Sequence, residues 1–152
     1  MSYQIGDIIP SITLQDTDGN HVTIKSGTDK YTILLFFPLA FTGVCTTEMC
    51  TVRDNMKVYE SLGTNVFGIS IDSFFCLKAF KEATNLNFSL LSDFNKVQTT
   101  NFGILNNDHF GMIGVAKRSV FVLDSDMRLL HSEILEDAGN LPNFNKIKEA
   151  LR

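Results

Sequence analysis

The segment of residues 36–50 reads FFPLAFTGVCTTEMC. With the preceding letters YTILL it completes the apolar run 31–37, which is typical of a β-strand buried on both faces. Pro38 ends that strand, and Thr42 is a suitable N-cap for a helix that begins after it. The stretch therefore predicts a buried strand, a turn and a helix whose first turn contains Cys45.

Cys45 lies on the apolar face of the predicted helix. At about 100° of rotation per residue, five side chains fall within about 40° of one direction. They are Cys45, Met49, Val52, Met56 and Tyr59. This stripe predicts contact with the sheet, so the thiol points inward into a pocket. Unpaired backbone N–H groups and the positive end of the helix dipole favour a thiolate there.

Three neighbours decide between an inert and a reactive Cys45. A cysteine on an apolar face is most often a small core residue. Here Pro38 can shield the sulfur from water, Thr42 offers a hydroxyl one turn earlier, and Glu48 can orient nearby donors. Together these neighbours favour a reactive thiolate.

Six further strands are predicted from short apolar or alternating stretches between turn-forming residues. They are residues 12–15, 22–25, 65–71, 88–91, 119–123 and 128–133. The first two and the last two form hairpins around turn-rich segments. Strand 65–71 follows strand 31–37 after a helix, and this spacing predicts a parallel pair with a crossover helix.

Three further helices are predicted from capping residues. Their expected starts are Asp72 or Ser73, Ser92 or Asp93, and Pro142 or Asn143. The first ends near Thr84 with Phe80 and Ala83 facing the core, and the last ends at Leu151. We therefore expect an α/β fold with a central mixed sheet flanked by helices and an N-terminal β-hairpin, for which a thioredoxin-like arrangement is the natural candidate.

Composition limits the possible functions. A chain of 152 residues with 44% apolar and 20% charged residues predicts a single domain spanning residues 1–152. The net charge of -4 and a sequence pI near 5.3, without a Lys/Arg run, exclude nucleic acid and membrane surfaces as expected partners. The N-terminus does not resemble a signal peptide and no run is long enough for a bilayer, so we expect a cytoplasmic protein.

No cofactor or metal is expected. Three cysteines do not make a disulfide framework, and the three histidines, including His109, lie far apart without ligand spacing. The loop 106–114 follows no predicted strand and lacks a P-loop lysine, so it is not expected to bind phosphate. His109 is interpreted as an ordinary loop residue, with a place at the mouth of a pocket as the alternative.

The order Pro38, Thr42, Cys45 has the spacing Pro-x-x-x-Thr-x-x-Cys and resembles the active-site motif of the peroxiredoxin family, of the AhpC/TSA superfamily. The resemblance continues through GISIDS at 68–73, LLSDF at 90–94 and RSVFVLD at 118–124. Arg118, the first residue of the last stretch, matches the family's active-site arginine. The resemblance implies a thioredoxin-like fold and a thiol-dependent peroxidase that reduces hydrogen peroxide and organic hydroperoxides.

The chemistry of peroxide cleavage agrees with that resemblance. Thiolate attack needs a deprotonated sulfur, donors that align the two oxygens, and stabilisation of the charge on the leaving oxygen. Cys45 would supply the sulfur, Arg118 a permanent charge, and Thr42 a hydroxyl beside backbone donors. The family implies a thiol reductant such as thioredoxin or glutaredoxin. The alternative is a redox-sensing module that signals through Cys45 oxidation without efficient turnover.

Cys50 is the candidate resolving cysteine for a sulfenic acid at Cys45. On an intact helix their Cα atoms lie roughly 8.7 Å apart and about 140° around the axis, beyond the about 7 Å that a disulfide tolerates. The bridge requires the first turns to unwind. The spacing Cys-x-x-x-x-Cys resembles the bacterioferritin-comigratory or Q type, whereas FFPLAFTG also resembles the AhpE one-cysteine type. We favour an intramolecular disulfide over direct reduction by an external thiol.

The third cysteine and the oligomeric state are less constrained by the sequence. Cys76 shares the apolar face of Phe80, which predicts a buried inert thiol. Some members of the family pair through the active-site edge and Q-type members are often monomers. We expect a homodimer with Phe41 and Ile113 in its contact.

Overall fold

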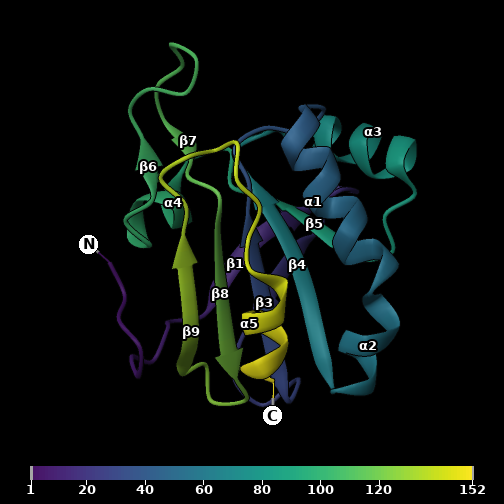
Figure 1. Ribbon diagram of the computed structural model, residues 1–152, viewed down its shortest axis with the longest axis vertical. Helices are drawn as coiled ribbons and strands as arrows, with labels where there is room; N and C mark the ends of the chain where they lie inside the picture. The colour runs from purple at the N-terminus through teal and green to yellow at the C-terminus, as the bar shows by residue number, and fades with distance from the viewer. Residues whose placement is uncertain (1, 152) are drawn as a thin grey trace.

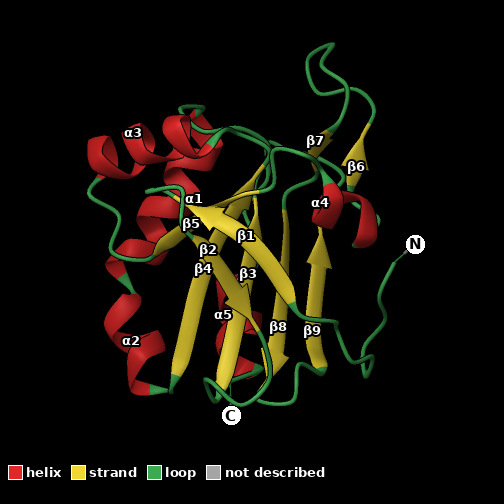
Figure 2. Cartoon of the chain, turned by 180° about the vertical axis from the view of Figure 1, so that it is seen from behind, coloured by secondary structure: helices red, strands yellow, loops and turns green. Residues whose placement is uncertain are grey.

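The computed structural model describes residues 2–151 and has a seven-stranded mixed sheet at its centre (Figures 1 and 2). One of its interior strands is β3 (Tyr31–Phe36), and all six residues of β3 are buried. The parallel neighbour β4 (Thr64–Ser70) and the antiparallel neighbour β8 (Ser119–Asp124) lie on either side of β3. The continuous apolar run at 31–37 therefore correctly predicted a strand that is buried on both faces.

The outer strands complete the order β2-β1-β5-β4-β3-β8-β9. They are β1 (Ile12–Asp16), β2 (His21–Ile24), β5 (Ser89–Ser92) and β9 (Leu129–Ile134). Both predicted hairpins are present, because β1 pairs antiparallel with β2 and β8 with β9. The α/β fold with a mixed sheet and an N-terminal hairpin is confirmed.

Helices cover one face of the sheet most completely (Figure 1). They are α1 (Gly43–Asp54), α2 (Met56–Ser61), α3 (Phe74–Thr84) and α5 (Phe144–Glu149). The predicted crossover from β3 to β4 consists of α1 and α2, separated only by Asn55. Gly68 of β4 allows α1 to approach the sheet closely, because a Cβ there would lie 3.3 Å from the Met49 sulfur and 2.6 Å from Leu90.

A second core lies on the opposite face, where Leu34 and Phe36 of β3 meet Phe102 and the edge hairpin (Figure 2). The short helix α4 (Val97–Asn101) covers this side and starts later than predicted. Asp93 still caps it across the intervening turn, since its carboxylate accepts from the N–H groups of Gln98 at 3.1 Å and Thr99 at 2.7 Å. The N-cap of α4 is Lys96, so the predicted start at Ser92 or Asp93 was wrong, although the Asp93 carboxylate binds the first N–H groups of the helix.

Two further expectations needed correction. In α3, Ser73 is the N-cap as predicted, but Leu77 and Phe80 are buried whereas Ala83 is exposed. Each step of three residues turns the helix by only about 300°, so position 83 rotates away from the face of Leu77. The last helix, capped by Asn143, ends at Glu149 and not at Leu151.

The loop 106–114 is the tip of a hairpin that the sequence did not indicate. It is flanked by β6 (Leu105–Asn106) and β7 (Val115–Ala116), which pair antiparallel. Strands of two residues are too short for an alternation pattern to reveal them. The statement that this loop follows no strand was therefore wrong. Within residues 2–151, no helix is long and apolar enough to cross a membrane.

Candidate active site

The start of α1 lies just beyond the end of β3, where the chain turns through the buried Pro38. Thr42 is the N-cap as predicted, and the Thr46 N–H donates to its carbonyl at 2.9 Å. Because that is the first hydrogen bond of the helix, the N–H groups of the preceding turn have no acceptor within α1. Cys45 lies in this turn with 1% of its surface exposed.

The inward direction of Cys45 is confirmed by the burial of the whole stripe. All of Cys45, Met49, Val52, Met56 and Tyr59 are buried. The stripe continues across the break at Asn55, which shows that packing on the sheet keeps α1 and α2 on one face.

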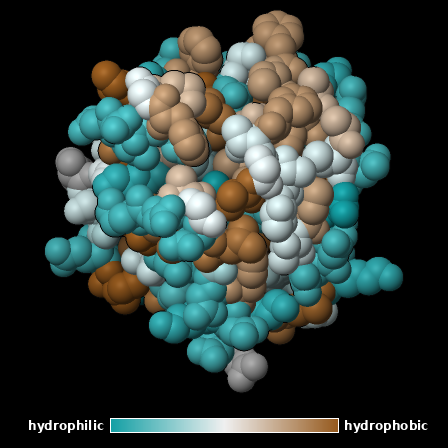
Figure 3. Space-filling model, turned by 45° about the horizontal axis from the view of Figure 1, so that its top comes forward, coloured by the Kyte–Doolittle hydropathy of each residue, from teal (hydrophilic) through white to brown (hydrophobic). Residues whose placement is uncertain are grey.

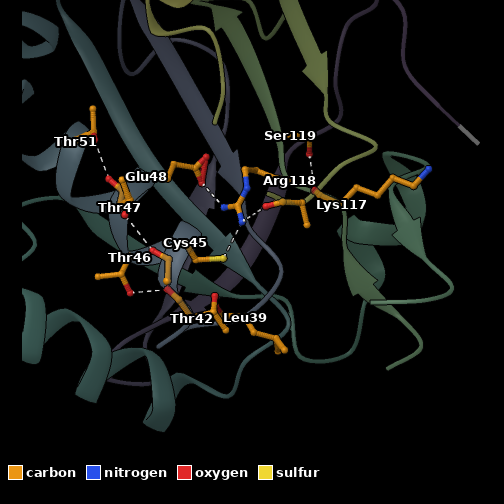
Figure 4. Close-up of polar contacts among 12 residues, drawn as sticks. Leu39, Thr42, Cys45, Thr46, Thr47, Glu48, Thr51, Lys117, Arg118 and Ser119 are labelled. Carbon is orange, nitrogen blue, oxygen red and sulfur yellow. Dashed lines mark hydrogen bonds and ion pairs between the residues drawn. The ribbon is translucent and has the colours of Figure 1, made fainter. Parts of the chain in front are cut away.

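Arg118 reaches Cys45 from a position 73 residues later in the sequence. It directly precedes β8, and the register that pairs Phe36 with Ser119 sets it beside the end of β3. One Arg118 Nη atom donates to Cys45 Sγ at 3.2 Å and to the Ala138 carbonyl at 3.1 Å, and the other donates to Glu48 Oε1 at 3.2 Å (Figure 4). The fold thus brings together three of the residues that the sequence singled out.

Glu48 and Arg118 form an ion pair away from water, with 0% and 2% of their surfaces exposed. Burial raises the pKa of Glu48 from 4.5 to about 7, against the opposing effect of the Arg118 charge and hydrogen bond. Glu48 Oε2 and Arg118 Nε have no hydrogen-bond partner within the described chain. One buried cation therefore serves two acidic groups, the carboxyl and the thiol.

Thr42 and Pro38 frame the turn in front of Cys45. The Thr42 hydroxyl donates to the Leu39 carbonyl at 2.9 Å, so its oxygen retains lone pairs that can accept a hydrogen bond. Pro38 is buried beside the core that contains Cys45.

Asp72 is a site residue that sequence reasoning missed except as a possible helix cap. Its Oδ2 accepts from the Ala40 N–H at 2.8 Å and from the Ser70 hydroxyl at 2.6 Å, and thereby holds the turn between Pro38 and Thr42. An acidic residue just after a strand parallel to β3 was the available signal, because such strand ends share one edge of the sheet.

A cavity of about 720 Å³ opens in front of these residues. Its inner wall contains Thr42, Gly43 and Arg118, and its outer wall includes the β6–β7 hairpin and the segment after β9. In the view of Figure 3, many of the side chains on the upper part of the molecule are apolar. His109 is 7% exposed and lines the cavity, so its interpretation as an ordinary loop residue was wrong.

None of the three cysteines lines this cavity, although Cys45 contacts the lining residue Arg118. Cys50 is half-buried on the same uninterrupted helix as Cys45, and both thiols are free. Cys76 is also half-buried, not buried as predicted, because Leu77 takes the inward position in α3. Partial burial and the nearby Asp72 carboxylate raise the pKa of Cys76. Across residues 2–151, no group of three or more potential metal ligands is present.

Comparisons with known proteins agree with this geometry. The AhpC/TSA family model matches residues 5–132. Peroxiredoxin Bcp of Escherichia coli is 35% identical over 129 residues, covering 83% of this chain and 82% of its own. A Mycobacterium tuberculosis protein named as a peroxiredoxin is 38% identical over 128 residues, covering 82% and 81%.

A solved structure supports the same assignment. The crystal structure of peroxidoxin BcpB from Mycobacterium tuberculosis superposes with a TM-score of 0.86 at 28% identity, covering 97% of this chain and 95% of that chain. The family match, the relatives and the buried contact between a first-turn cysteine and an arginine all agree. This chain belongs to the AhpC/TSA family, the peroxiredoxins, which are thiol-dependent peroxidases.

Proposed function

We propose that Cys45 is the peroxidatic residue and that Arg118, Thr42 and Pro38 form its immediate catalytic surroundings. The observation that carries the proposal is the 3.2 Å contact between Arg118 and the Cys45 sulfur, because both side chains are buried. A guanidinium there stabilises a thiolate and can also donate to a bound peroxide. Thr42 at the cavity wall accepts a hydrogen bond from the peroxide OH.

The reaction is a displacement at oxygen. The Cys45 thiolate attacks the terminal oxygen of ROOH, an S–O bond forms, and the O–O bond breaks. The leaving RO⁻ takes a proton from solvent in the cavity and departs as an alcohol, or as water when R is hydrogen. Sulfur is oxidised to the sulfenic acid and the peroxide is reduced. Arg118 and the free N–H groups of the first turn stabilise the charge on the leaving oxygen.

Glu48 orients Arg118 and sets the charge balance of the site. When Glu48 is protonated, the arginine cation and the thiolate balance each other in the buried site. When Glu48 ionises, the Arg118 cation faces two anions, the carboxylate and the thiolate. The buried site solvates these charges poorly. The raised pKa of Glu48 supports a role for its neutral form as partner of the thiolate.

Cys50 is proposed to resolve the Cys45 sulfenic acid by forming a disulfide with loss of water. The composition of α1 supports the unwinding that this step requires. Its sequence GVCTTEMCTVRD contains one glycine and three threonines, residues of low helix propensity. The Thr46, Thr47 and Thr51 hydroxyls donate to carbonyls four residues earlier, which competes with the backbone ladder.

A dithiol protein such as thioredoxin, or glutaredoxin, is the proposed reductant, because a disulfide in an unwound segment is accessible to an attacking thiolate. Hydrogen peroxide and organic hydroperoxides are the proposed substrates. The chain is also proposed to form a homodimer through Phe41 and Ile113, which are 56% and 74% exposed.

Replacing Cys45 by Ser is expected to lower the rate of hydrogen peroxide reduction at least about a thousandfold, because the nucleophile is lost. Steady-state consumption with a dithiol reductant measures it, and Cys76→Ser should keep the native rate. Full activity in Cys45→Ser would refute the assignment. A native protein that is oxidised once and not recycled would instead support the sensing module.

Treatment with one equivalent of peroxide is expected to link Cys45 to Cys50 within one chain, which peptide mass spectrometry under non-reducing conditions detects. Cys50→Ser should accumulate sulfenic acid on Cys45, trapped by a dimedone probe. If the native protein also accumulates an unlinked sulfenic acid, the enzyme belongs to the one-cysteine type.

Glu48→Gln is expected to remove a pH-dependent loss of stability. Between pH 4.5 and about 7, Glu48 stays protonated in the folded protein and is ionised in the unfolded chain, so rising pH favours unfolding. The native protein should lose on the order of 3 kcal/mol relative to the variant across this window. Urea unfolding at several pH values measures the difference. The exposed control Glu60→Gln should show the same dependence of unfolding free energy on pH as the native protein. If Glu48→Gln also shows the native dependence, the pKa of Glu48 is not raised.

Ile113→Glu is expected to weaken the homodimer at least about tenfold, because it buries a charge in an apolar contact. Sedimentation over a range of concentrations measures the dissociation constant. Phe94→Glu, which changes an apolar side chain with 63% exposure elsewhere, serves as control. A native protein that is monomeric at every concentration would refute the dimer.

A further inference from the structure

The cavity beside Arg118 and Thr42 is much larger than the peroxide group of a substrate requires. Its volume is about 720 Å³, whereas a water molecule occupies about 30 Å³ of the liquid and drug-sized ligands occupy pockets of about 300–1,000 Å³. The inner wall at Arg118 and Thr42 accounts for the peroxide group. The remaining volume extends outward to the β6–β7 hairpin, which plays no part in the steps derived above.

We propose that this outer volume binds the uncharged, apolar body of an organic hydroperoxide, with Phe110 and Met112 as its specificity-determining residues. The proposal rests on the function assigned to Cys45 and adds the residues and charges that select among organic hydroperoxides. It also predicts discrimination by charge, because carboxylates surround the mouth of the cavity.

The hairpin tip presents an unusually exposed aromatic ring. Phe110 is 90% exposed and Met112 is 42% exposed, and both line the cavity. Phe110 has a φ of 54°, in the left-handed region that a bulky residue seldom adopts. Two backbone hydrogen bonds of 2.9 Å between His109 and Met112 close this turn, and Gly111 N–H donates to Asp108 at 2.9 Å. The hairpin therefore imposes the position of the ring.

His109 supports Phe110 from the inner side. It is buried, and its ring meets the Phe110 ring edge-on at a centroid distance of 4.8 Å. An apolar side chain held in water at the wall of a large cavity gains most from a ligand that removes it from water. Val44 in the first turn of α1 adds a further apolar contact on the inner wall.

The net charge at the mouth of the cavity is negative and disfavours an anionic substrate. Asp108, Glu136 and Asp137 belong to its lining, and the lining cation Arg118 is buried at the inner end. Glu136 is paired with Lys117 at 3.0 Å, which leaves Asp108 and Asp137 as the carboxylates without a lysine or arginine partner in the described chain. A hydroperoxide with its own carboxylate must approach these like charges within a Debye length of about 8 Å.

The test compares hydrogen peroxide, cumene hydroperoxide and its para-carboxylate derivative, because the last two share one apolar body and differ in charge. The native enzyme should show a kcat/KM about tenfold lower for the carboxylate derivative. The double variant Phe110→Ala/Met112→Ala should lower kcat/KM for cumene hydroperoxide about tenfold more than for hydrogen peroxide. The double variant Asp108→Asn/Asp137→Asn retains both hydrogen-bond acceptors and should narrow the difference between the two cumene compounds.

Control variants change similar side chains outside the cavity. Phe94→Ala and Asp126→Asn should leave all three rates at native values, since Phe94 and Asp126 are exposed and lie apart from this wall. Equal native rates for the two cumene compounds would overturn the charge discrimination. If Phe110→Ala/Met112→Ala lowers kcat/KM equally for hydrogen peroxide and cumene hydroperoxide, the specificity role of these residues is overturned. This holds whether or not the sedimentation of the variant changes. Failure of the Cys45 assignment can be distinguished from failure of this specificity proposal. If Cys45 is not the nucleophile, Cys45→Ser will not lower the rate of hydrogen peroxide reduction.

Discussion

A single buried guanidinium holds the site together. Arg118 donates to the Cys45 sulfur, to Glu48 and to the Ala138 carbonyl, and with 2% exposure it obtains little solvation from water. Removing a cation from water is costly unless good partners replace the solvent. The partners come from α1 and from the segment after β9, so the contact requires β8 beside β3 and the start of α1 above the end of β3. The contacts of Arg118 therefore depend on the placement of β8 next to β3 in the sheet.

The helix α1 has two opposing requirements. Its inner face must hold Cys45 and Met49 in a dry core, which the close approach over Gly68 makes possible. Its outer face is rich in threonines whose hydroxyls bond back to the helix carbonyls. Packing on one side thus compensates for weak intrinsic helicity on the other. In the proposed cycle, a helix of this kind can be ordered for the attack and open for the disulfide.

In the proposed complex, the peroxide group and the apolar body of the substrate contact different parts of the chain. Cys45, Thr42 and Arg118 lie at the ends of core elements, whose positions are fixed by burial. The outer cavity wall comes from a hairpin with strands of two residues and from the segment between β9 and α5 (Figure 1). Such peripheral segments can change without disturbing the core. The specificity proposed here therefore depends on the least regular part of the fold.

Local patterns in the sequence predicted the buried strand β3, the helix that follows it and the inward direction of Cys45, because a continuous apolar run and a helical stripe lie within one segment. It also supplied Arg118, although only through family resemblance, since nothing local distinguishes that arginine from a surface charge. The tertiary structure decided which atoms meet: the Arg118 contact with Cys45, the support of the turn by Asp72, the burial of His109 and the hairpin that carries Phe110. These depend on strand order and register across 73 positions, and on two-residue strands. A periodicity within one segment contains no information about strand order or register between distant segments, because the packing of the whole chain determines long-range pairing.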